Sequence, residues 1–294
     1  MRKATIGMRI FAVFNYTFMA LMALSCLLPI VNLLAISLSS SPAVATGQVT
    51  FFPVDFTWDS YLFMANRAPF FRSLAVSGLR LALAVPISVL VAVLAAYPLS
   101  RQNKEFKARK YYIWYFIIPM LFHGGLIPTF MIVRNTGLLD SIWALVLPSA
   151  VNIFNILLLM NFFRSLPKEM EEAASIDGAG HIIVLTRIIL PVSAPVLATV
   201  TLFFIVNHWN AWFDGLIYMS SPDNHPLQTY LQTQVISQNV ITLETMRDVR
   251  QLGNVSDRTG TAAQIFLASI PVFLIYPFLQ KYFTTGIVMG SVKG

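Results

Sequence analysis

Long apolar stretches, separated by short segments rich in charged residues, run through most of this chain. Six of them hold about 20 or more mostly apolar residues, the length that an α-helix needs to cross the hydrocarbon core of a bilayer. They cover residues 9–38, 71–99, 111–133, 142–163, 188–218 and 261–283. We therefore expect an all-α, polytopic membrane protein with six transmembrane helices in a single domain over residues 1–294.

The composition indicates the same class. The chain is 56% hydrophobic and 11% charged, whereas a soluble domain carries about 25% charged residues. The apolar run at 9–38 is longer than the core of a secretory signal peptide, which has about 7 to 15 residues, so we expect it to remain as the first membrane helix. The one cysteine, Cys26, excludes a disulfide framework or a zinc set within a single chain.

The distribution of basic residues predicts the orientation. The chain has 20 Lys and Arg against 13 Asp and Glu, and its net charge is +7. The basic residues lie in short segments between spans rather than along one stripe, so we expect no nucleic-acid partner. An even number of spans puts both termini on one side, and the excess of Lys and Arg there indicates the cytoplasm. Segments 39–69 and 219–260 then face outward, and segment 164–190 faces inward.

The inward segment 164–190 predicts a short helix. Pro167 suits a first helical turn, and the acidic residues that follow it favour the positive end of the helix dipole. Gly178 can adopt the left-handed conformation that ends a helix, so we expect the helix over residues 167–176. Such a helix is either a lever that a cytoplasmic partner pushes or a solvated connector between two spans.

The same segment carries a specific motif, which reads Glu172-Ala173-Ala174, then Asp177-Gly178-Ala179, then Ile188 and Leu190-Pro191 after eight further residues. In residue types and spacing it resembles the cytoplasmic loop of ABC importer permeases. In that family the loop lies between transmembrane helices 4 and 5 and forms a coupling helix, which docks in a cleft of the ATPase subunit. The resemblance implies a coupling role for Glu172, Ala173, Ala174, Asp177, Gly178 and Ala179 and, in the C-terminal tail, for Lys293. For Glu172 the alternative is pairing within its own loop.

Other stretches resemble the carbohydrate, or maltose-type, group of these permeases. Residues 96–101, Ala-Tyr-Pro-Leu-Ser-Arg, are similar to that group's Ala-Tyr-x-x-x-Arg. A subgroup associated with oligosaccharides from complex polysaccharides is similar at residues 122–128, 137–139, 143–145, 162–163, 208–210 and 290–294. Two residues depart from the pattern and bear on the substrate: His123, where the subgroup often has a small residue, and Arg80, which lies inside a span.

The resemblance implies a permease subunit of an ATP-binding-cassette importer, which moves an oligosaccharide across the cytoplasmic membrane by alternating access. The partners that it implies are a second homologous permease, two ATPase subunits, an extracytoplasmic solute-binding protein and membrane lipid. The chain contains no Gly-x-x-x-x-Gly-Lys-Ser/Thr string. We therefore expect ATP and Mg on the partner ATPase, no cofactor or metal on this chain, and a transport subunit rather than an enzyme.

Polar residues inside the spans are the candidates for a substrate path, because polar groups at membrane depth usually face a cavity or another helix. They are Arg80, His123, Asn152, Asn155, Asn207, His208, Trp209, Asn210, Trp212 and Asp214. For the cluster at 207–214 the alternative is an aromatic belt at the outer interface. Arg80 could instead bind a backbone carbonyl or pair with the sister permease, and His123 could pack against it. If both line the path, the expected substrate is acidic, such as an oligosaccharide that contains uronic acids.

An ion-coupled secondary carrier of a polar solute is the alternative function. Such carriers usually have repeated halves and membrane-embedded acids that bind the coupling ion. Here Asp214 is the clear acid within a span, and the sequence shows no apparent internal repeat. A membrane enzyme is less favoured, because the four His residues lack metal-ligand spacing such as His-Glu-x-x-His.

Overall fold

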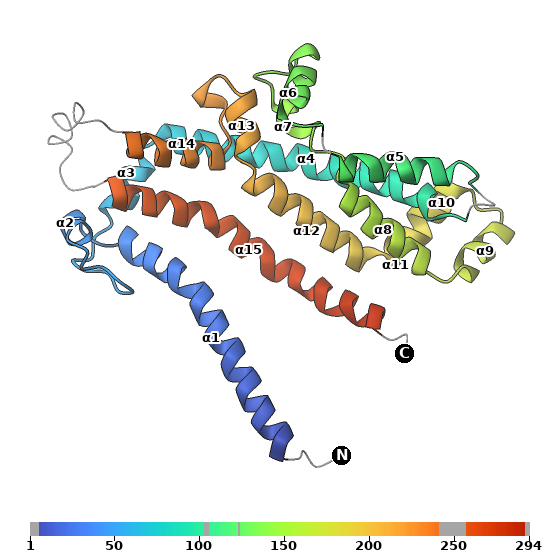
Figure 1. The fold of residues 1–294 in the computed structure, drawn as a ribbon, viewed down its shortest axis with the longest axis horizontal. Coiled ribbons are helices and arrows are strands. Elements are labelled where there is room, and N and C mark those ends of the chain that lie inside the picture. Colours follow the sequence, from blue (N-terminus) through green and yellow to red (C-terminus); the bar gives the residue numbers. More distant parts are fainter. Residues whose placement is uncertain (1–5, 103–105, 123, 241–256, 292–294) are drawn as a thin grey trace. The chain divides into compact units, whose positions relative to one another are not determined.

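The computed structural model describes residues 6–102, 106–122, 124–240 and 257–291, and within them the chain is helical without a strand (Figure 1). Contacts divide the chain into two compact units. Unit 1 comprises Met1–Phe70 and Leu231–Ile270, and unit 2 comprises Phe71–Tyr230 and Pro271–Gly294. The helical class expected from the hydropathy pattern is confirmed for the described residues.

The described helices include three that are long and apolar enough to cross a membrane, and up to five spans if each bent pair counts as one. The three continuous ones are α1 (Ile6–Ser37), α4 (Ala68–Ser100) and the stretch Arg258–Ile275 of α15 (Asp257–Ser291). The bent pairs are α5 (Arg109–Leu121) with α6 (Leu126–Asn135), and His181–Val192 with α12 (Ala194–Asn210). The expected spans therefore correspond partly to continuous helices and partly to broken ones.

The stretch 142–163, expected as one span, consists of two helices. They are α7 (Ile142–Val146) and α8 (Ile153–Ser165). Pro148 lies between them, and because proline has no backbone N–H it cannot continue the hydrogen-bond ladder of α7. Hydropathy describes how apolar the stretch is but not where its helix breaks, so α8 is left as a shorter apolar helix of 13 residues.

In unit 1, the segment 39–69 after α1 folds back on the end of that helix. It contains two short helices, α2 (Ser41–Ala45) and α3 (Asp59–Ala65). The hydroxyl oxygens of Ser37 and Tyr61 lie 2.8 Å apart in a hydrogen bond, and an isolated antiparallel bridge joins Ser39 to Phe56. The segment is therefore an ordered cap on α1 rather than an open loop.

The apolar core of unit 2 joins α4, α8, α12 and the bent segment that precedes α12. That segment consists of α10 (His181–Val184), the π-helix η1 (Leu185–Ile189) and α11 (Leu190–Val192). On the α4 side the core contains Ala92 and Ala96, which are fully buried against partners such as Leu159 and Phe204. Small residues let membrane helices approach closely. Because lipid tails are as apolar as the side chains, the hydrophobic effect does not drive helices together there, and close packing stabilises this core instead.

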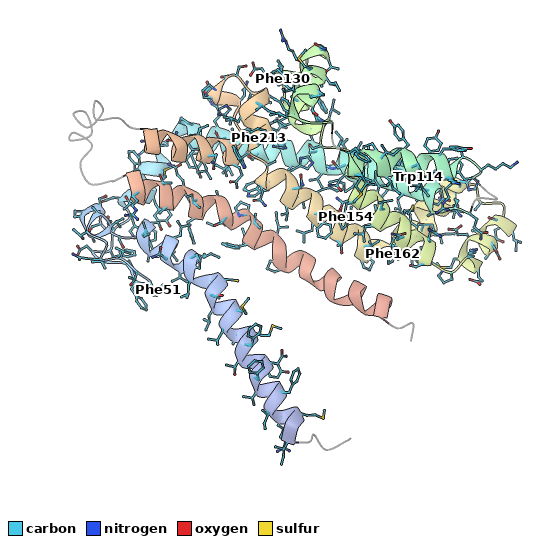
Figure 2. All side chains as sticks on the ribbon, viewed as in Figure 1. Phe51, Trp114, Phe130, Phe154, Phe162 and Phe213 are labelled. Carbon is cyan, nitrogen blue, oxygen red and sulfur yellow. The ribbon has the colours of Figure 1, made fainter. Side chains whose placement is uncertain are left out.

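Large apolar side chains cover the outside of several helices. Trp114, labelled on α5 in Figure 2, is 54% exposed. Residues such as Phe11, Phe14 and Tyr16 of α1 are exposed as well. A soluble monomer rarely exposes apolar patches of this extent. Such surfaces are typical of helices that face an apolar environment such as lipid.

Two loops of unit 2 are joined through Asp140, which has a φ of +58°. Its backbone N–H donates to the Tyr218 carbonyl at 3.0 Å. Its carboxylate accepts hydrogen bonds from the backbone N–H groups of Ser220, at 2.6 Å, and Ser221, at 3.3 Å. These bonds fix the end of α13 (Phe213–Tyr218) beside the loop that leads into α7.

The segment 219–260 contains a regular helix, although its polarity suggested a loop. A short 3₁₀ turn at Pro222–Asn224 leads into α14 (Leu227–Val240). Gly215 of α13 lies against the start of this helix, where a Cβ on Gly215 would come within 2.2 Å of Thr229 Oγ1 and 2.9 Å of Pro226 Cδ. The absence of a side chain at Gly215 is what permits this approach.

Replacement of Gly215 by Ala should therefore destabilise the protein. Overpacking of this kind costs about 1–3 kcal/mol, and the thermal unfolding midpoint in detergent should decrease. Gly78→Ala is the matched control, because a Cβ on Gly78 in α4 would meet nothing within 4 Å. Equal midpoints for Gly215→Ala and Gly78→Ala would contradict the close packing of α13 on α14.

The Asp140 contacts predict a pH dependence. The hydrogen bond from the Ser220 N–H lowers the pKa of the Asp140 carboxyl below its ordinary value of 3.8. Because the folded pKa is depressed, the ionised carboxylate stabilises the fold above pH 3.8, and this contribution is lost as the pH decreases through the lower folded pKa. The unfolding midpoint of Asp140→Asn should depend less on pH in this acidic range than that of the parent. Identical acid profiles would show that the contact does not stabilise the fold.

Candidate functional site

A helix occupies the position predicted within segment 164–190. It is α9 (Glu169–Ile176), which begins two residues later than the expected range of 167–176 and ends at the same residue. Three acidic residues lie in its first turn, at the positive end of the helix dipole. After the helix, Gly178 has a φ of +81°, a conformation that residues with a Cβ rarely adopt.

The motif residues around α9 form an exposed set and a packed set. Exposed are Glu172, Ala173, Asp177 and Gly178, whereas Ala174 and Ala179 pack against the apolar core of unit 2. Ile176, beside them, is 86% exposed. An exposed apolar side chain among acidic ones on a short helix offers a surface that a second protein can cover. Lys293, the remaining candidate of the coupling set, lies outside the described residues.

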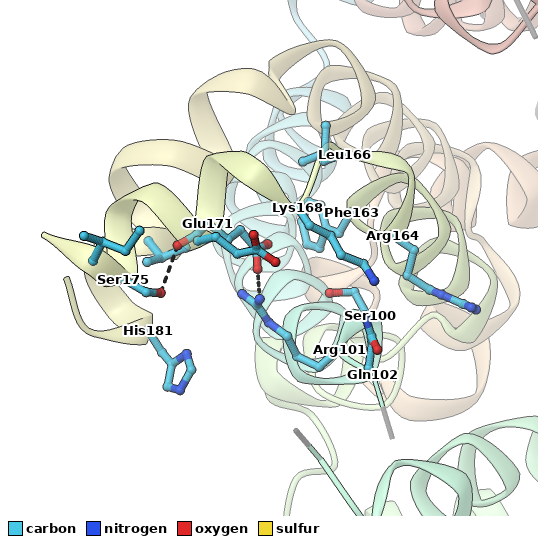
Figure 3. A pocket seen from close by; sticks show the side chains of 13 residues that line it. Ser100, Arg101, Gln102, Phe163, Arg164, Leu166, Lys168, Glu171, Ser175 and His181 are labelled. Atoms are coloured by element: carbon cyan, nitrogen blue, oxygen red, sulfur yellow. Dashed lines mark hydrogen bonds and ion pairs between the residues drawn. The ribbon is translucent and has the colours of Figure 1, made fainter. Parts of the chain in front are cut away.

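Side chains at the end of α4 contact the α9 segment directly. Arg101, immediately after α4, forms an ion pair with Glu171 on α9 (Figure 3). The Arg101 guanidinium also lies 4.3 Å from the centroid of the Tyr97 ring. The Tyr97 hydroxyl in turn donates to the His181 carbonyl oxygen at 3.2 Å. The residues before and after the Gly178 turn are thus both connected to the last turns of α4.

A cavity of about 500 Å³ lies beside this contact. Its polar lining comes from the end of α4, from the end of α8 and from the α9 segment (Figure 3). Arg101, Arg164, Lys168, Glu171, Glu172 and His181 contribute its charged and titratable groups. Because the lining contains both basic and acidic groups, the cavity is suited to a protein surface with its own charges better than to a simple anion.

Arg80, the unexpected cation in α4, is fully buried and paired. Its side chain is 1% exposed and forms an ion pair with Asp214 of α13, whose side chain is 24% exposed. The guanidinium also donates to the Ala211 carbonyl oxygen at 3.5 Å and to the Leu145 carbonyl oxygen at 3.4 Å. The structure therefore brings Arg80 and Asp214 together, and it places Arg80 on backbone carbonyls, one of the arrangements left open by the sequence.

These contacts explain how the helix can be interrupted between α12 and α13. A broken helix frees carbonyl groups, which are costly at membrane depth unless the protein provides donors. The Ala211 carbonyl accepts from Arg80, and the Trp212 carbonyl accepts from the Thr229 hydroxyl at 2.7 Å. The polar cluster at 207–214 therefore contains the helix break between α12 and α13. At this break, residues of α4, α12, α13 and α14 come together.

The other candidates for the substrate path differ in exposure. Asn207, Asn210 and Trp212 are exposed, whereas His208 and Trp209 are buried. Both ring nitrogens of His208 lack a hydrogen-bond partner among the described residues.

Two further path candidates, Asn152 and Asn155, lie at the start of α8. Asn152 caps the helix, since its side-chain oxygen accepts from the Asn155 N–H at 3.1 Å, and Asn155 itself is buried. His123 lies outside the described residues.

Three contacts of this region did not emerge from the sequence. They are the Arg101–Glu171 ion pair, the Thr229 hydrogen bond to the chain break, and the Asp140 contact between loops. The contact between Arg101 and the Tyr97 ring could have been predicted, because both residues belong to the Ala-Tyr-x-x-x-Arg string and are four residues apart at the end of a helix. The partners of Thr229 and Asp140 are distant in sequence and gave no such signal.

The burial of Arg80 predicts that loss of its charge destabilises the fold. Arg80→Met leaves Asp214 as an uncompensated, largely buried carboxylate, which costs about 3–5 kcal/mol when a buried pair is broken. Arg80→Met with Asp214→Asn should recover much of that loss.

Thermal unfolding of the detergent-solubilised protein measures the effect. The control is Arg72→Met, because the side chains of the Arg72–Asp223 ion pair are 54% and 63% exposed, and exposed pairs contribute about 0–1 kcal/mol. An Arg80→Met protein as stable as the Arg72→Met control would exclude the structural role of Arg80.

Two known proteins are similar in sequence to this chain over nearly its whole length. The chain is 36% identical over 289 residues to the polygalacturonan/rhamnogalacturonan transport system permease protein YtcP of Bacillus subtilis, with 97% of this chain and 99% of that protein covered. It is 37% identical over 286 residues to the protein LplC of Bacillus subtilis, with 97% and 96% covered.

A solved structure is also similar over nearly the whole chain. It is the crystal structure of a bacterial ABC transporter involved in the import of the acidic polysaccharide alginate. The TM-score is 0.87 at 31% sequence identity, with 96% of this chain and 100% of that chain covered.

The family follows from a match that covers most of the chain. Residues 62–289 match the family described as "Binding-protein-dependent transport system inner membrane component". The match confirms the resemblance to ABC importer permeases that the Glu172-Ala173-Ala174 motif indicated. This chain belongs to the family of binding-protein-dependent transport system inner membrane components.

Proposed function

We propose that this chain is one of two permease subunits of an ABC importer, and that the importer moves an oligosaccharide across the cytoplasmic membrane by alternating access. The observation that carries the proposal is the similarity, over 96% of this chain and at a TM-score of 0.87, to a chain of the bacterial ABC transporter involved in alginate import. The family membership does not favour the ion-coupled secondary carrier, which works without a binding protein.

The proposed topology has six spans with both termini in the cytoplasm. The bent pairs α5–α6 and α10–α12 then count as one span each, and α8 with α7 forms another. This arrangement puts the basic segments at 101–110 and 164–187 on the cytoplasmic side, as the positive-inside rule requires. It also puts α9 on the cytoplasmic face.

We assign the coupling role to α9 and the turn after it. Glu172, Ala173, Asp177 and Gly178 are exposed and available to a separate ATPase subunit. ATP and Mg bind to that subunit, of which the assembly has two, and its closure pushes α9 of each permease. Ala174 and Ala179 hold the helix to the core of unit 2. We assign Lys293, in the C-terminal tail, to the same coupling role.

The proposed substrate is an oligosaccharide derived from a complex, acidic polysaccharide. The support comes from two similar proteins: one is named as a polygalacturonan/rhamnogalacturonan transport permease, and the other belongs to a transporter involved in the import of the acidic polysaccharide alginate. An extracytoplasmic solute-binding protein delivers the sugar, and the second permease completes the path.

Within this chain, Asn207, Asn210 and Trp212 are the proposed contacts with the sugar. They are exposed, and residues three apart on α12 lie on one helix face. Arg80 carries no net charge to the path, because Asp214 neutralises it. The positive charge that an acidic sugar requires must therefore come from other residues, from His123 or from the sister permease.

The test is ATP hydrolysis and sugar uptake by the complete complex, with its binding protein, in liposomes. Acidic and neutral oligosaccharides are compared, and acidic ones should stimulate ATP hydrolysis in the parent. Glu172→Ala should remove that stimulation and the retention of the ATPase during purification, because the exposed carboxylate is part of the docking surface.

Glu169→Ala is the matched control, since it removes the same charge from an exposed position on the same helix outside the motif. It should behave as the parent. If no sugar stimulates hydrolysis and no ATPase is retained by the parent, the importer function is wrong. If neutral sugars alone stimulate it, the acidic substrate is wrong.

A further inference from the structure

The contact between the end of α4 and the α9 segment joins two elements with very different lengths. The helix α4 has 33 residues and runs without a break, whereas α9 has eight. Their polar connection includes the Arg101–Glu171 ion pair, the stacking of Arg101 on Tyr97, and the Tyr97 hydrogen bond to His181. One side chain, Arg101, thus contacts both α9 and the last turns of α4.

The connection is shielded enough from water to have a defined geometry. The side chains of Arg101 and Glu171 are 14% and 23% exposed. An ion pair of this burial is screened less by salt than a surface pair, so it holds the two side chains together at short range. The Tyr97 ring, 4.3 Å from the guanidinium, restricts it further.

The other attachments of α9 are weaker in direction. Ala174 packs against the core with a single methyl group, and Gly178 follows the helix with a left-handed backbone. Apolar contacts of this size permit sliding, because dispersion depends little on orientation. The ion pair is therefore the polar contact that holds α9 to the end of α4.

We propose that Arg101 is a positioning residue for energy coupling, which holds α9 to the end of α4 through Glu171 so that the two helices move together during the transport cycle. The inference rests on the proposed function, in which an ATPase pushes α9. It assigns to Arg101 and Glu171 a role inside the permease, distinct from the docking surface around Glu172. Since α4 also carries Arg80, the same helix contacts the helix break at Ala211 and Trp212.

The first measurement is the amount of sugar imported per ATP hydrolysed by the reconstituted complex. Glu171→Gln keeps the shape of the side chain and removes its charge. It should lower the import per ATP at least about fivefold, the lower end of typical coupling between sites, while the ATPase stays bound. Arg101→Lys retains the charge but not the planar stacking, so it should lie between Glu171→Gln and the parent.

The exchanged pair, Arg101→Glu with Glu171→Arg, separates coupling from folding. It restores an ion pair of opposite polarity and should recover more than half of the import that Arg101→Glu alone loses. Parent-like import per ATP in Glu171→Gln would overturn the inference. The inference would also be overturned if the import per ATP decreased only in proportion to the amount of bound ATPase or to the unfolding midpoint, because that result would indicate structural damage.

A second measurement does not depend on transport. Spin labels at Gln102→Cys and Ser175→Cys, in a Cys26→Ser background, report the distance between the end of α4 and α9; both positions line the cavity beside the ion pair. The distance in the parent complex should be the same with and without ATP, and Glu171→Gln should broaden it. A distance that changes with ATP in the parent overturns the joint movement, even if transport is normal. Absence of sugar-stimulated hydrolysis in the parent instead overturns the proposed function and the inference with it.

Discussion

The constraint on which unit 2 depends is that a backbone carbonyl released from a helix at membrane depth must find a donor within the protein. The break between α12 and α13 releases the carbonyls of Ala211 and Trp212. Arg80 and Thr229 donate to them from two other helices. Because these donors come from α4 and α14, the need to satisfy the break also determines which helices surround it.

A donor as strong as Arg80 introduces a cost of its own, since a lone cation in this environment is unfavourable. Asp214, in the first turn of α13, offsets that cost, and it lies three residues after the Ala211 carbonyl that Arg80 binds. A similar logic applies to α9, where acidic residues at a helix start meet the Arg101 cation. In both places an ion pair connects α4, or the residue directly after it, to a short helix, α13 or α9, that follows a non-helical turn.

Much of this fold could be predicted from the sequence because lipid imposes a simple pattern. Apolar length identified the stretches that became α1, α4 and α15, and the Pro167 and Gly178 signals placed α9. The breaks in the other stretches could not be located, because they depend on donors that lie far away along the chain. The partner of Arg80 is 134 residues distant, and no local pattern reveals it.

The neutrality of the Arg80–Asp214 pair has an electrical consequence. A membrane potential does work of about 2.3 kcal/mol per 100 mV on each elementary charge that crosses it. Two opposite charges that move together carry no net charge, so the voltage does almost no work on them when α4 and α13 shift. The membrane potential therefore contributes little to any movement of the Arg80–Asp214 pair.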